Sequence, residues 1–384
     1  FWWWDMVQIT IAGLKGKSSS DKITCCADLP SVEQNHYLNK RTSILPPRFK
    51  PHDFLRPRAS LVFLIPLVAI LGTIVGISAW YVVLSARYPQ QYQVIEGLMP
   101  QFNPVDIRFL LNNERLCAED EVYTVVIIHS KPDHMEHREV IRNTWGSVKR
   151  VGDRSVKLVF LLGRVNDPMV QSVIRLESQK YSDIVQGDFL DSYRNLTLKH
   201  LMGYQWVNQH CGDVTWILKS DDDIFIDITQ LHELVAEMLG DHPTNTLACN
   251  ALPSGTEVKR TGKWGVTPEE YSNNTYPSYC AGMAYLITPD LMKTFLEKSK
   301  AVPFFWVDDV YVTGMVAMET NCSRYYLNLR YSQSQEELYP WLKSIRSTRP
   351  PYVIVHVQTG ILGWAQVVLK LWEKLAVYYT RRDS

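Results

Sequence analysis

Apolar runs of strand length alternate with helical patterns through the middle of the chain. The runs 122–129 and 156–162 are rich in β-branched and aromatic residues, which is typical of buried strands, and Gly163 closes the second run. Residues 135–144 carry the apolar spacing of a helix. A further helical stretch follows Asp167-Pro168, a pair that resembles an N-cap with proline at the first helical position.

The same alternation continues toward a third long strand. Residues 184–185 form a short apolar run, 195–208 a helical pattern and 214–226 another apolar run. This order predicts an α/β domain with a mostly parallel central sheet and helices on both faces. Ligands bind such folds beyond the carboxyl ends of the strands, where His129 and the acidic residues within 214–226 lie.

Three adjacent carboxylates interrupt the apolar run 214–226. Asp221, Asp222 and Asp223 repel one another, and they are costly to desolvate unless a cation or hydrogen-bond donors compensate them. A hard divalent cation meets that need, because Mg²⁺ and Mn²⁺ prefer carboxylate oxygens and keep positions open for phosphate. The alternative is an acidic turn between two strands, but such turns usually contain glycine, proline or asparagine. The pattern therefore predicts a metal–diphosphate site.

A membrane span precedes this domain in the apolar pattern. Residues 59–86 carry no charge, and their centre, 61–84, is long enough to cross a bilayer with some tilt. More Lys and Arg lie before the span than close behind it, which predicts a cytosolic N-terminus and a luminal C-terminal part. Gly72-x-x-x-Gly76 is compatible with a homodimer formed by helix pairing, with lipid-facing glycines as the alternative.

Sequons and cysteines agree with a luminal location. Three glycosylation sequons follow the predicted span, and they begin at Asn195, Asn273 and Asn321. Five cysteines also follow it and would face an oxidising compartment, namely Cys117, Cys211, Cys249, Cys280 and Cys322. An odd number leaves at least one of them unpaired or joined to another chain, and spacing alone does not assign the pairs.

The chain divides into five predicted segments. The 384 residues divide into a cytosolic tail at 1–58, a membrane anchor at 59–86, a stem at 87–120, the α/β domain at 121–360 and a C-terminal helix at 361–384. The 40 Lys and Arg balance 40 Asp and Glu, and no long basic run occurs. Nucleic acid is therefore not a predicted partner.

Several motifs follow one another along the α/β domain. They are Arg138-Glu-Val-Ile-Arg142-Asn-Thr144-Trp145-Gly146, Phe160-Leu-Leu-Gly163, Gly187-Asp188-Phe-Leu-Asp191-Ser-Tyr193-Arg-Asn195-Leu-Thr-Leu-Lys199, the three aspartates, Lys263-Trp264, Tyr276-Pro277-Ser-Tyr279-Cys280-Ala-Gly282-Met-Ala-Tyr285 and Val307-Asp308-Asp309-Val310-Tyr311. In this order they resemble the β-1,3-glycosyltransferase family of Golgi type II membrane enzymes, which includes β-1,3-galactosyl- and β-1,3-N-acetylglucosaminyltransferases. Ala284 departs from the family pattern, where a glycine is common.

The resemblance implies a fold, a reaction and a location. The fold would be a GT-A-like nucleotide-sugar-binding domain preceded by one transmembrane helix, with the catalytic domain in the Golgi lumen. The reaction would move galactose or N-acetylglucosamine from a UDP-sugar to the 3-hydroxyl of an acceptor glycan on a glycoprotein or glycolipid, with inversion and with Mn²⁺ or Mg²⁺ as cofactor. Lys263-Trp264 favours galactose.

The resemblance also implies roles for individual residues. Asp223 would be the direct metal ligand, and His356, which ends a predicted late strand, would be the second one. Asp221 and Asp222 would lie nearer the nucleotide sugar. Asp309 would be the general base that takes the proton from the acceptor hydroxyl. Its alternative is to cap the helix that it opens, because a carboxylate suits the positive end of a helix dipole, and one residue can do both.

Five further residues are candidates for nucleotide-sugar binding. Arg142 and Lys199 would pair with phosphate or, equally, form structural ion pairs. Lys263 and Trp264 would contact a sugar face or simply pack, which is the safer interpretation for most aromatic residues here. Asp188 belongs to the motif that precedes the helix before the aspartates.

Other functions fit less of the pattern. His129, His134 and His137 straddle a strand end and a loop without a dependable ligand spacing, so zinc is not predicted. A catalytically silent luminal chaperone or binding relative of the same fold is the alternative, but both the aspartate cluster and the late base are intact. A metal-dependent phosphohydrolase would need ligands for a second ion, and the sequence offers no clear set.

Overall fold

The computed structural model describes residues 106–118, 121–345, 348–358 and 363–382, which belong to one unit. The predicted tail and membrane span at 1–86, with its glycine pair, lie outside the described residues. No helix among the described residues is both long and apolar enough to cross a membrane.

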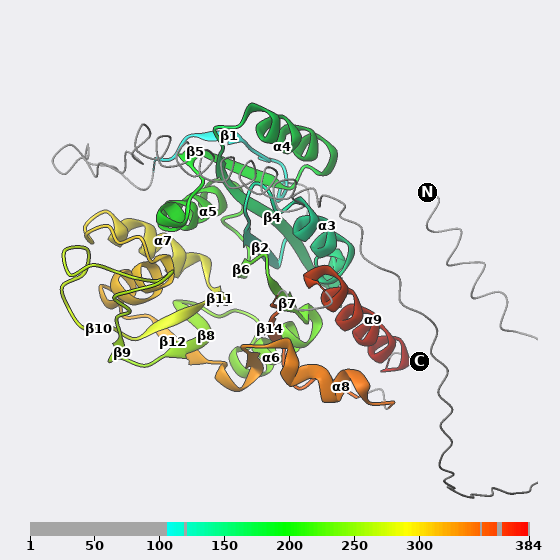
Figure 1. Cartoon of the computed structure of the whole chain (residues 1–384). Helices are drawn as coiled ribbons and strands as arrows, with labels where there is room; N and C mark the ends of the chain where they lie inside the picture. The colour runs from blue at the N-terminus through cyan, green and yellow to red at the C-terminus, as the bar shows by residue number, and fades with distance from the viewer. Residues whose placement is uncertain (1–105, 119–120, 346–347, 359–362, 383–384) are drawn as a thin grey trace, which may run out of the picture. The chain divides into compact units, whose positions relative to one another are not determined.

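A mixed sheet of nine strands forms the centre of this unit (Figure 1). Its strands are, in spatial order, β1 (Phe109–Leu111), β5 (Ile184–Leu190), β4 (Arg154–Arg164), β2 (Thr124–His129), β6 (Trp216–Asp221), β11 (Tyr279–Ile287), β8 (Thr246–Leu252) and β12 (Ser323–Tyr326), with β3 (Arg150–Val151) beside β4. Strands β5, β4, β2 and β6 are parallel, whereas β11 runs antiparallel to both of its neighbours. The predicted α/β class is confirmed, with a parallel block at the centre of the sheet.

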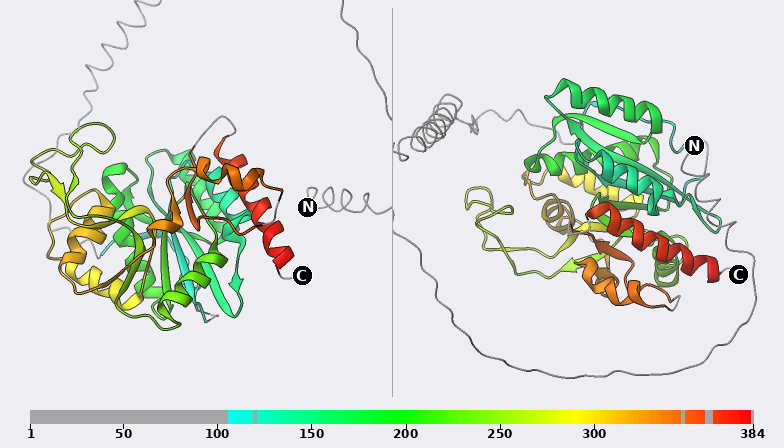
Figure 2. Two further views of the ribbon diagram at one scale, coloured as in Figure 1. Left: turned by 90° about the horizontal axis from the view of Figure 1, so that it is seen from below. Right: turned by 45° about the vertical axis from the view of Figure 1, so that its right-hand side comes forward.

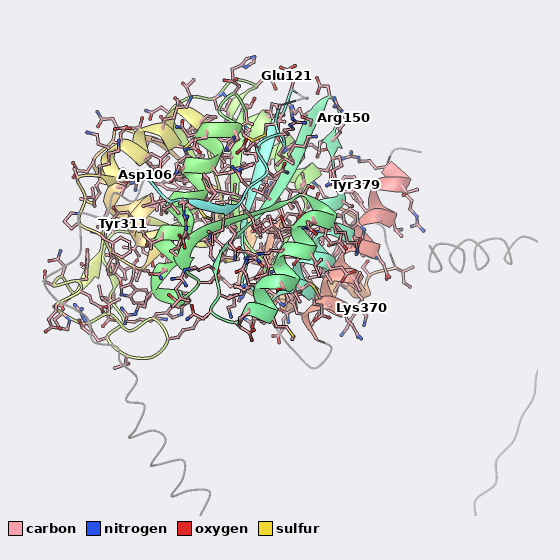
Figure 3. All side chains as sticks on the ribbon, turned by 90° about the horizontal axis from the view of Figure 1, so that it is seen from above. Asp106, Glu121, Arg150, Tyr311, Lys370 and Tyr379 are labelled. Carbon is pink, nitrogen blue, oxygen red and sulfur yellow. A yellow bond between two sulfur atoms is a disulfide. The ribbon has the colours of Figure 1, made fainter. Side chains whose placement is uncertain are left out.

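Helices cover both faces of the sheet (Figures 1 and 2). One face carries α5 (Leu196–His210), α7 (Pro289–Ser299) and the π-helical segment η3 (Val310–Val316), and the other carries α3 (Met135–Asn143), α4 (Pro168–Tyr181), α6 (Ile228–Leu239) and α9 (Trp364–Arg382). Figure 3 shows the separation, since Tyr311 of η3 and Lys370 of α9 lie on opposite sides of the domain.

Strand β2 shows why the central runs do not alternate between apolar and polar residues. Val125 and Ile127 pack in the core beneath α5, whereas Val126 and Ile128 pack in the core that contains Ile141 of α3. A parallel strand covered on both faces buries each successive side chain, so its sequence does not alternate between apolar and polar.

Two smaller sheets and several short helices complete the unit. Strands β7 (Ile224–Ile226), β14 (Ile354–His356) and β13 (Tyr331–Ser332) form one sheet, and β9 (Thr256–Glu257) and β10 (Thr275–Tyr276) form the other. The short helices are η1 (Trp145–Ser147), η2 (Tyr193–Asn195), η4 (Asn328–Arg330), η5 (Gln335–Leu338) and α8 (Tyr339–Lys343). Strand β14 pairs antiparallel with β7, which follows the aspartates directly.

Element boundaries agree with the sequence where local signals are strong. The Asp167 side chain accepts hydrogen bonds from the backbone N–H groups of Met169 and Val170, so the predicted N-cap of α4 is confirmed. Strand β5 extends to Leu190, beyond the predicted 184–185. Its later residues pair with β4 and β1, although they are not a continuous apolar run.

The described part of the predicted stem at 87–120, residues 106–118, is attached to the domain. Strand β1 joins the central sheet there by pairing with β5, and a disulfide links Cys117 to Cys211 just after α5. A strand of three residues is too short to leave an apolar pattern, so only the tertiary pairing reveals it. The second disulfide, Cys249–Cys280, joins β8 to β11, which leaves Cys322 outside both pairs.

Gly163 is predicted to be intolerant of a side chain. A Cβ at this position would lie 2.8 Å from the backbone nitrogen of Asp191 and from the carbonyl oxygen of Phe189. Gly163→Ala should therefore lower the free energy of unfolding by about 1–3 kcal/mol. Urea denaturation would measure the loss, with Gly212→Ala as the control, because a Cβ there meets only ordinary contacts at 3.5 Å and beyond. Equal stability of the two variants would contradict the close approach.

Candidate functional site

The turn between β6 and β7 separates the three adjacent carboxylates. Strand β6 ends at Asp221 and the chain turns at Asp222 and Asp223, and the side chains of Asp221 and Asp223 are 40% and 43% exposed, whereas that of Asp222 is 8% exposed. In the register of the sheet, Asp221 is paired with His129 of β2, so both predicted strand ends meet at one edge. The cluster therefore consists of two open carboxylates and one buried carboxylate.

Asp222 is held by the loop and the helix that follow β2. Its Oδ2 accepts hydrogen bonds from the Ser130 hydroxyl at 2.7 Å and from Nδ1 of His134 at 2.9 Å. His137 donates from Nδ1 to the Asp222 carbonyl oxygen at 3.2 Å, and its ring stacks on Trp364 of α9 at 3.9 Å. Burial alone would raise the pKa of Asp222, but these donors hold it below its usual value. Asp222 thus fixes the turn as a buried anion.

Asp223 meets His356 across the small sheet. Nε2 of His356 lies 3.4 Å from Oδ2 of Asp223, because β14 pairs with β7 and the Val357 N–H donates to the Asp223 carbonyl at 2.9 Å. The hydrogen bond to Asp223 raises the pKa of His356 above its ordinary value. The two residues predicted as metal ligands are 133 positions apart in sequence, and the fold brings them together.

Asp221 pairs with a lysine buried inside the sheet. Nζ of Lys219 lies 2.6 Å from Oδ1 of Asp221, and the lysine side chain is 1% exposed. Burial, together with repulsion from Asp223 and Asp308, raises the pKa of Asp221 to about 7 against the opposing attraction of Lys219. Lys219 also donates to the Gly282 carbonyl of β11, so the same ammonium contacts two neighbouring strands.

Asp309 contacts the backbone N–H of the same Gly282. Its Oδ2 accepts from the Gly282 N–H at 3.2 Å, and its Oδ1 accepts from the Val310 N–H at 2.8 Å. The second bond is the cap of η3, so the capping role is confirmed. A Cβ at Gly282 would come within 3.3 Å of Oδ2, so a side chain there would crowd the carboxylate. Burial and the nearby charge of Asp308 raise the pKa of Asp309 to about 7.

Asp308 faces inward, toward α5. Its Oδ2 accepts from Nδ1 of His200 at 2.9 Å, and Nδ1 of His129 lies 3.8 Å away. Nε2 of His200 contacts the hydroxyl of Tyr285, which in turn contacts the hydroxyl of Tyr204. Although burial would raise the pKa of Asp308, the His200 hydrogen bond and the charge of Lys219 lower it.

Aromatic side chains form a wall beside the carboxylates. The ring of Tyr193 lies 5.0 Å from that of Trp264 and 5.9 Å from that of Trp306, and Nζ of Lys263 lies 4.9 Å from the Trp264 centroid. Trp264 is 44% exposed. The buried Tyr193 hydroxyl has no hydrogen-bond partner among the described residues, and burial together with the charges of Asp308 and Asp309 raises its pKa. The wall thus offers an exposed ring face and an unpaired hydroxyl.

Three other candidates for nucleotide-sugar binding are engaged in ion pairs. Arg142 binds Glu177 at 2.8 Å and Asp183 at 2.7 Å, so the structure favours its structural alternative. Asp188 pairs with Arg108 and, at 3.3 Å, with Arg164 near the sheet edge.

Lys199 is also engaged. Its Nζ lies 2.9 Å from Oδ2 of Asp191 and donates to the Ser130 carbonyl at 2.6 Å. This buried pair holds the loop whose Ser130 hydroxyl contacts Asp222, so Lys199 supports the site from behind.

The sequons differ in accessibility. Asn273 and Asn321 are exposed. Asn195 donates to the Leu190 carbonyl at 2.8 Å, and the Thr197 hydroxyl of its sequon is buried and donates to the Phe305 carbonyl at 2.7 Å. Asn273 and Asn321 are therefore the more accessible acceptors in the folded domain.

His129, His134 and His137 do not form one cluster. Within the described residues, His134 and His137 gather with Asp222, while His129 gathers with His200 and Asp308. Both groups have ligand atoms close enough for an ion, but hydrogen bonds already account for the two carboxylates. A cavity of about 730 Å³ lies elsewhere, and Leu234, Met238, Leu252, Tyr326 and Leu329 line it without any residue of the carboxylate cluster.

The sequence patterns did not identify three residues on which the site depends. Lys219 is a charged residue inside a buried strand, and its position two residues before Asp221 places both on the same face, which was a usable signal. His200 and Tyr193 carried no such signal, because the residues that they contact, Asp308 and Tyr285 for His200 and Trp264 and Trp306 for Tyr193, are distant in the sequence.

Comparison with known proteins gives a consistent result. A family model described as galactosyltransferase matches residues 136–328, about half of the chain. Human β-1,3-galactosyltransferase 5 is 33% identical over 209 residues, which cover 54% of this chain and 66% of that protein. The gorilla protein of the same name is 32% identical over 54% of this chain and 69% of its own length. Mouse β-1,3-galactosyltransferase 1 is 30% identical over 55% of this chain and 64% of its own length.

Similarity to solved structures is more remote. The bifunctional glycosyltransferase WbbM has a TM-score of 0.36 at 11% identity, covering 69% of this chain and 52% of that one. Mouse xyloside xylosyltransferase 1 has a TM-score of 0.32 at 13% identity, covering 61% of this chain and 96% of that one. The sequence matches, which span about two thirds of the relatives, carry the conclusion that this chain belongs to the galactosyltransferase family.

Proposed function

We propose that this protein is a metal-dependent β-1,3-galactosyltransferase with a GT-A-like domain, acting on a terminal sugar of a glycoprotein or glycolipid. The observation that carries the proposal is the joint arrangement of Asp223 with His356 and of Asp309 with Gly282, on either side of the buried Lys219. The names of the similar galactosyltransferases support galactose over N-acetylglucosamine as the donor sugar. The Golgi membrane is the proposed location, with the domain in the lumen.

Asp223 and His356 fit a divalent cation such as Mn²⁺ or Mg²⁺. Their facing atoms are 3.4 Å apart, close to the separation of about 3 Å between adjacent ligands of an octahedral ion. Their side chains are 43% and 30% exposed, which leaves room for phosphate oxygens and water. When bound, the ion would neutralise the charge that develops on the departing UDP.

Asp309 is placed to act as the base. Oδ2 is oriented by the Gly282 N–H, and the pKa of about 7 allows the carboxylate to accept a proton near neutral pH. Direct displacement by the acceptor hydroxyl inverts the anomeric carbon and needs no enzyme nucleophile. The exposed ring of Trp264, with Tyr193 and Lys263 beside it, would contact a sugar face.

Removal of the metal ligands should abolish metal-dependent transfer. The purified full chain, supplied with a panel of UDP-sugars, simple sugar acceptors and Mn²⁺, is expected to use UDP-galactose and to form a 1→3 linkage. Asp223→Ala and His356→Ala should lower kcat/KM by about 10²-fold or more, because the charge on the leaving group is then uncompensated. Asp213→Ala, which changes an exposed aspartate before β6, is the control.

Two results would contradict this proposal. Transfer that is insensitive to chelation would exclude the metal, and full activity of Asp223→Ala would exclude this residue as its ligand. Complete absence of transfer by the unmodified chain would favour the catalytically silent relative.

Asp309→Asn should lower kcat by about 10²–10⁴-fold while leaving the KM for the UDP-sugar nearly unchanged. The amide keeps the shape of the carboxylate but cannot accept the proton. In the unmodified enzyme, kcat/KM should rise with pH up to about 7 and then level off, since the base works in its ionised form and its pKa is about 7. Substantial turnover by Asp309→Asn would remove this residue as the base and leave the transferase proposal standing.

Lys219→Met should destabilise the protein by up to about 3 kcal/mol at neutral pH, because it removes the buried cation that the partly exposed Asp221 shares with Asp308 and Asp309. The loss should shrink at lower pH. Asp221 and Asp309 have folded pKa values of about 7, above those of an unfolded chain, so protons stabilise the folded state as the pH falls through that value.

Urea denaturation at pH 5.5 and pH 8 would test this dependence. Lys300→Met is the control, because Lys300 pairs with Glu297 at the surface and is 42% exposed. A loss of stability that is equal at both pH values would show that packing, and not charge, explains the effect of Lys219→Met.

A further inference from the structure

A buried chain of hydrogen bonds runs from α5 and β11 to the residue beside the proposed base. It consists of Tyr204, Tyr285, His200 and Asp308, in that order. Tyr204, Tyr285 and His200 are fully buried, and Asp308 is 8% exposed. None of the four was assigned a role by the motifs or by the proposed reaction. The chain ends within one residue of Asp309.

The direction of these hydrogen bonds follows from the chemistry of their ends. Burial lowers the pKa of His200, so its ring is neutral at physiological pH and carries one N–H. An ionised Asp308 can only accept, so that N–H is on Nδ1 and Nε2 must accept from the Tyr285 hydroxyl. Tyr285 has then used its only proton, so the Tyr204 hydroxyl must donate to it. Every donor in the chain points toward Asp308.

We propose that His200 is a positioning residue that, oriented by Tyr285 and Tyr204, holds Asp308 as a fixed anion beside Asp309 and thereby sets the basicity of Asp309. The proposal rests on the proposed function, because it concerns the base of that reaction. A permanent negative charge next to a carboxylate favours the protonated form of that carboxylate, which makes it a stronger base when it is ionised.

The surrounding groups are consistent with this charge arrangement. Asp308 also faces Lys219 of β6 and His129 of β2, whose pKa is lowered well below the usual value by burial and by Lys219, so it stays neutral. Asp309 faces the Gly282 and Val310 N–H groups, Lys219, and the hydroxyl-bearing rings of Tyr193, Tyr276 and Tyr279. Lys219 is thus the cation that these two carboxylates share with Asp221.

The pH dependence of transfer separates this role from a purely structural one. In His200→Leu, Asp308 loses its nearest donor and binds a proton more readily, so its charge is absent near neutral pH. The acid limb, which is the rise of kcat/KM with pH below about pH 7, should then move to lower pH by roughly one unit. The kcat should fall roughly tenfold because the base is weaker. Asp308→Asn should move the limb in the same direction. His200→Asn, whose amide keeps a donor near the position of Nδ1, should restore the original limb.

His232→Asn is the matched control. His232 is also a buried histidine, but its Nε2 contacts the Thr124 hydroxyl at 3.1 Å instead of a carboxylate. This variant should cost stability without moving the acid limb. A lower kcat in His200→Leu with an unmoved limb, or an unmoved limb in Asp308→Asn, would overturn the proposal.

A spectroscopic measurement tests the same proposal without any reaction. Long-range ¹H–¹⁵N NMR on the full chain labelled at histidine should show His200 as the neutral Nδ1–H tautomer from pH 6 to 8. Tyr285→Phe should change the Nε2 shift of His200, because Nε2 then loses its donor. An imidazolium or an Nε2–H tautomer would overturn the proposal even if transfer occurs. If no transfer is detected but the tautomer is as stated, the proposed function fails and the hydrogen-bond direction stands.

Discussion

The buried ammonium of Lys219 is the interaction on which both halves of the site depend. It lies 2.6 Å from Asp221, donates to the Gly282 carbonyl, and is near Asp308 and Asp309. Burial raises the pKa values of Asp221 and Asp309 to about 7, because one cation inside the sheet cannot fully compensate three carboxylates, while the pKa of Asp308 stays low. The part of the site that would bind the leaving group and the part that would take the proton therefore depend on the same cation.

The topology of the sheet makes this sharing possible. Strand β11 lies antiparallel to β6, with Ala284 opposite Ser220, so the Gly282 peptide reaches the carboxyl end of the strand that carries Lys219 and Asp221. The Gly282 carbonyl accepts from Lys219, and the Gly282 N–H donates to Asp309. On the opposite flank, β14 pairs with β7 and brings His356 to Asp223. Backbone pairing thus places Gly282 beside Lys219 and places His356 beside Asp223.

Local pattern predicted much of the fold and some of the site. Continuous apolar runs indicated strands buried on both faces, and Asp167-Pro168 indicated a helix start, because both signals come from a few adjacent residues. The pattern could not place β1, whose three residues are defined only by their pairing with β5. It also did not decide whether Arg142 and Lys199 bind phosphate or form structural ion pairs. The structure shows carboxylates at both, namely Glu177 and Asp183 for Arg142 and Asp191 for Lys199.

By itself, the sequence determined that three adjacent aspartates interrupt a buried strand, that further acidic residues open a later helix, and that the motifs between them belong to one family. These facts are local, because each depends on residue type and short spacing. The tertiary structure alone decided that Asp222 turns inward to Ser130 and His134 while Asp221 and Asp223 stay open. It also decided that Lys219 and His200 supply the partners of the buried carboxylates. Charges separated by many residues interact only after folding has brought them together in a medium that screens them less than water does.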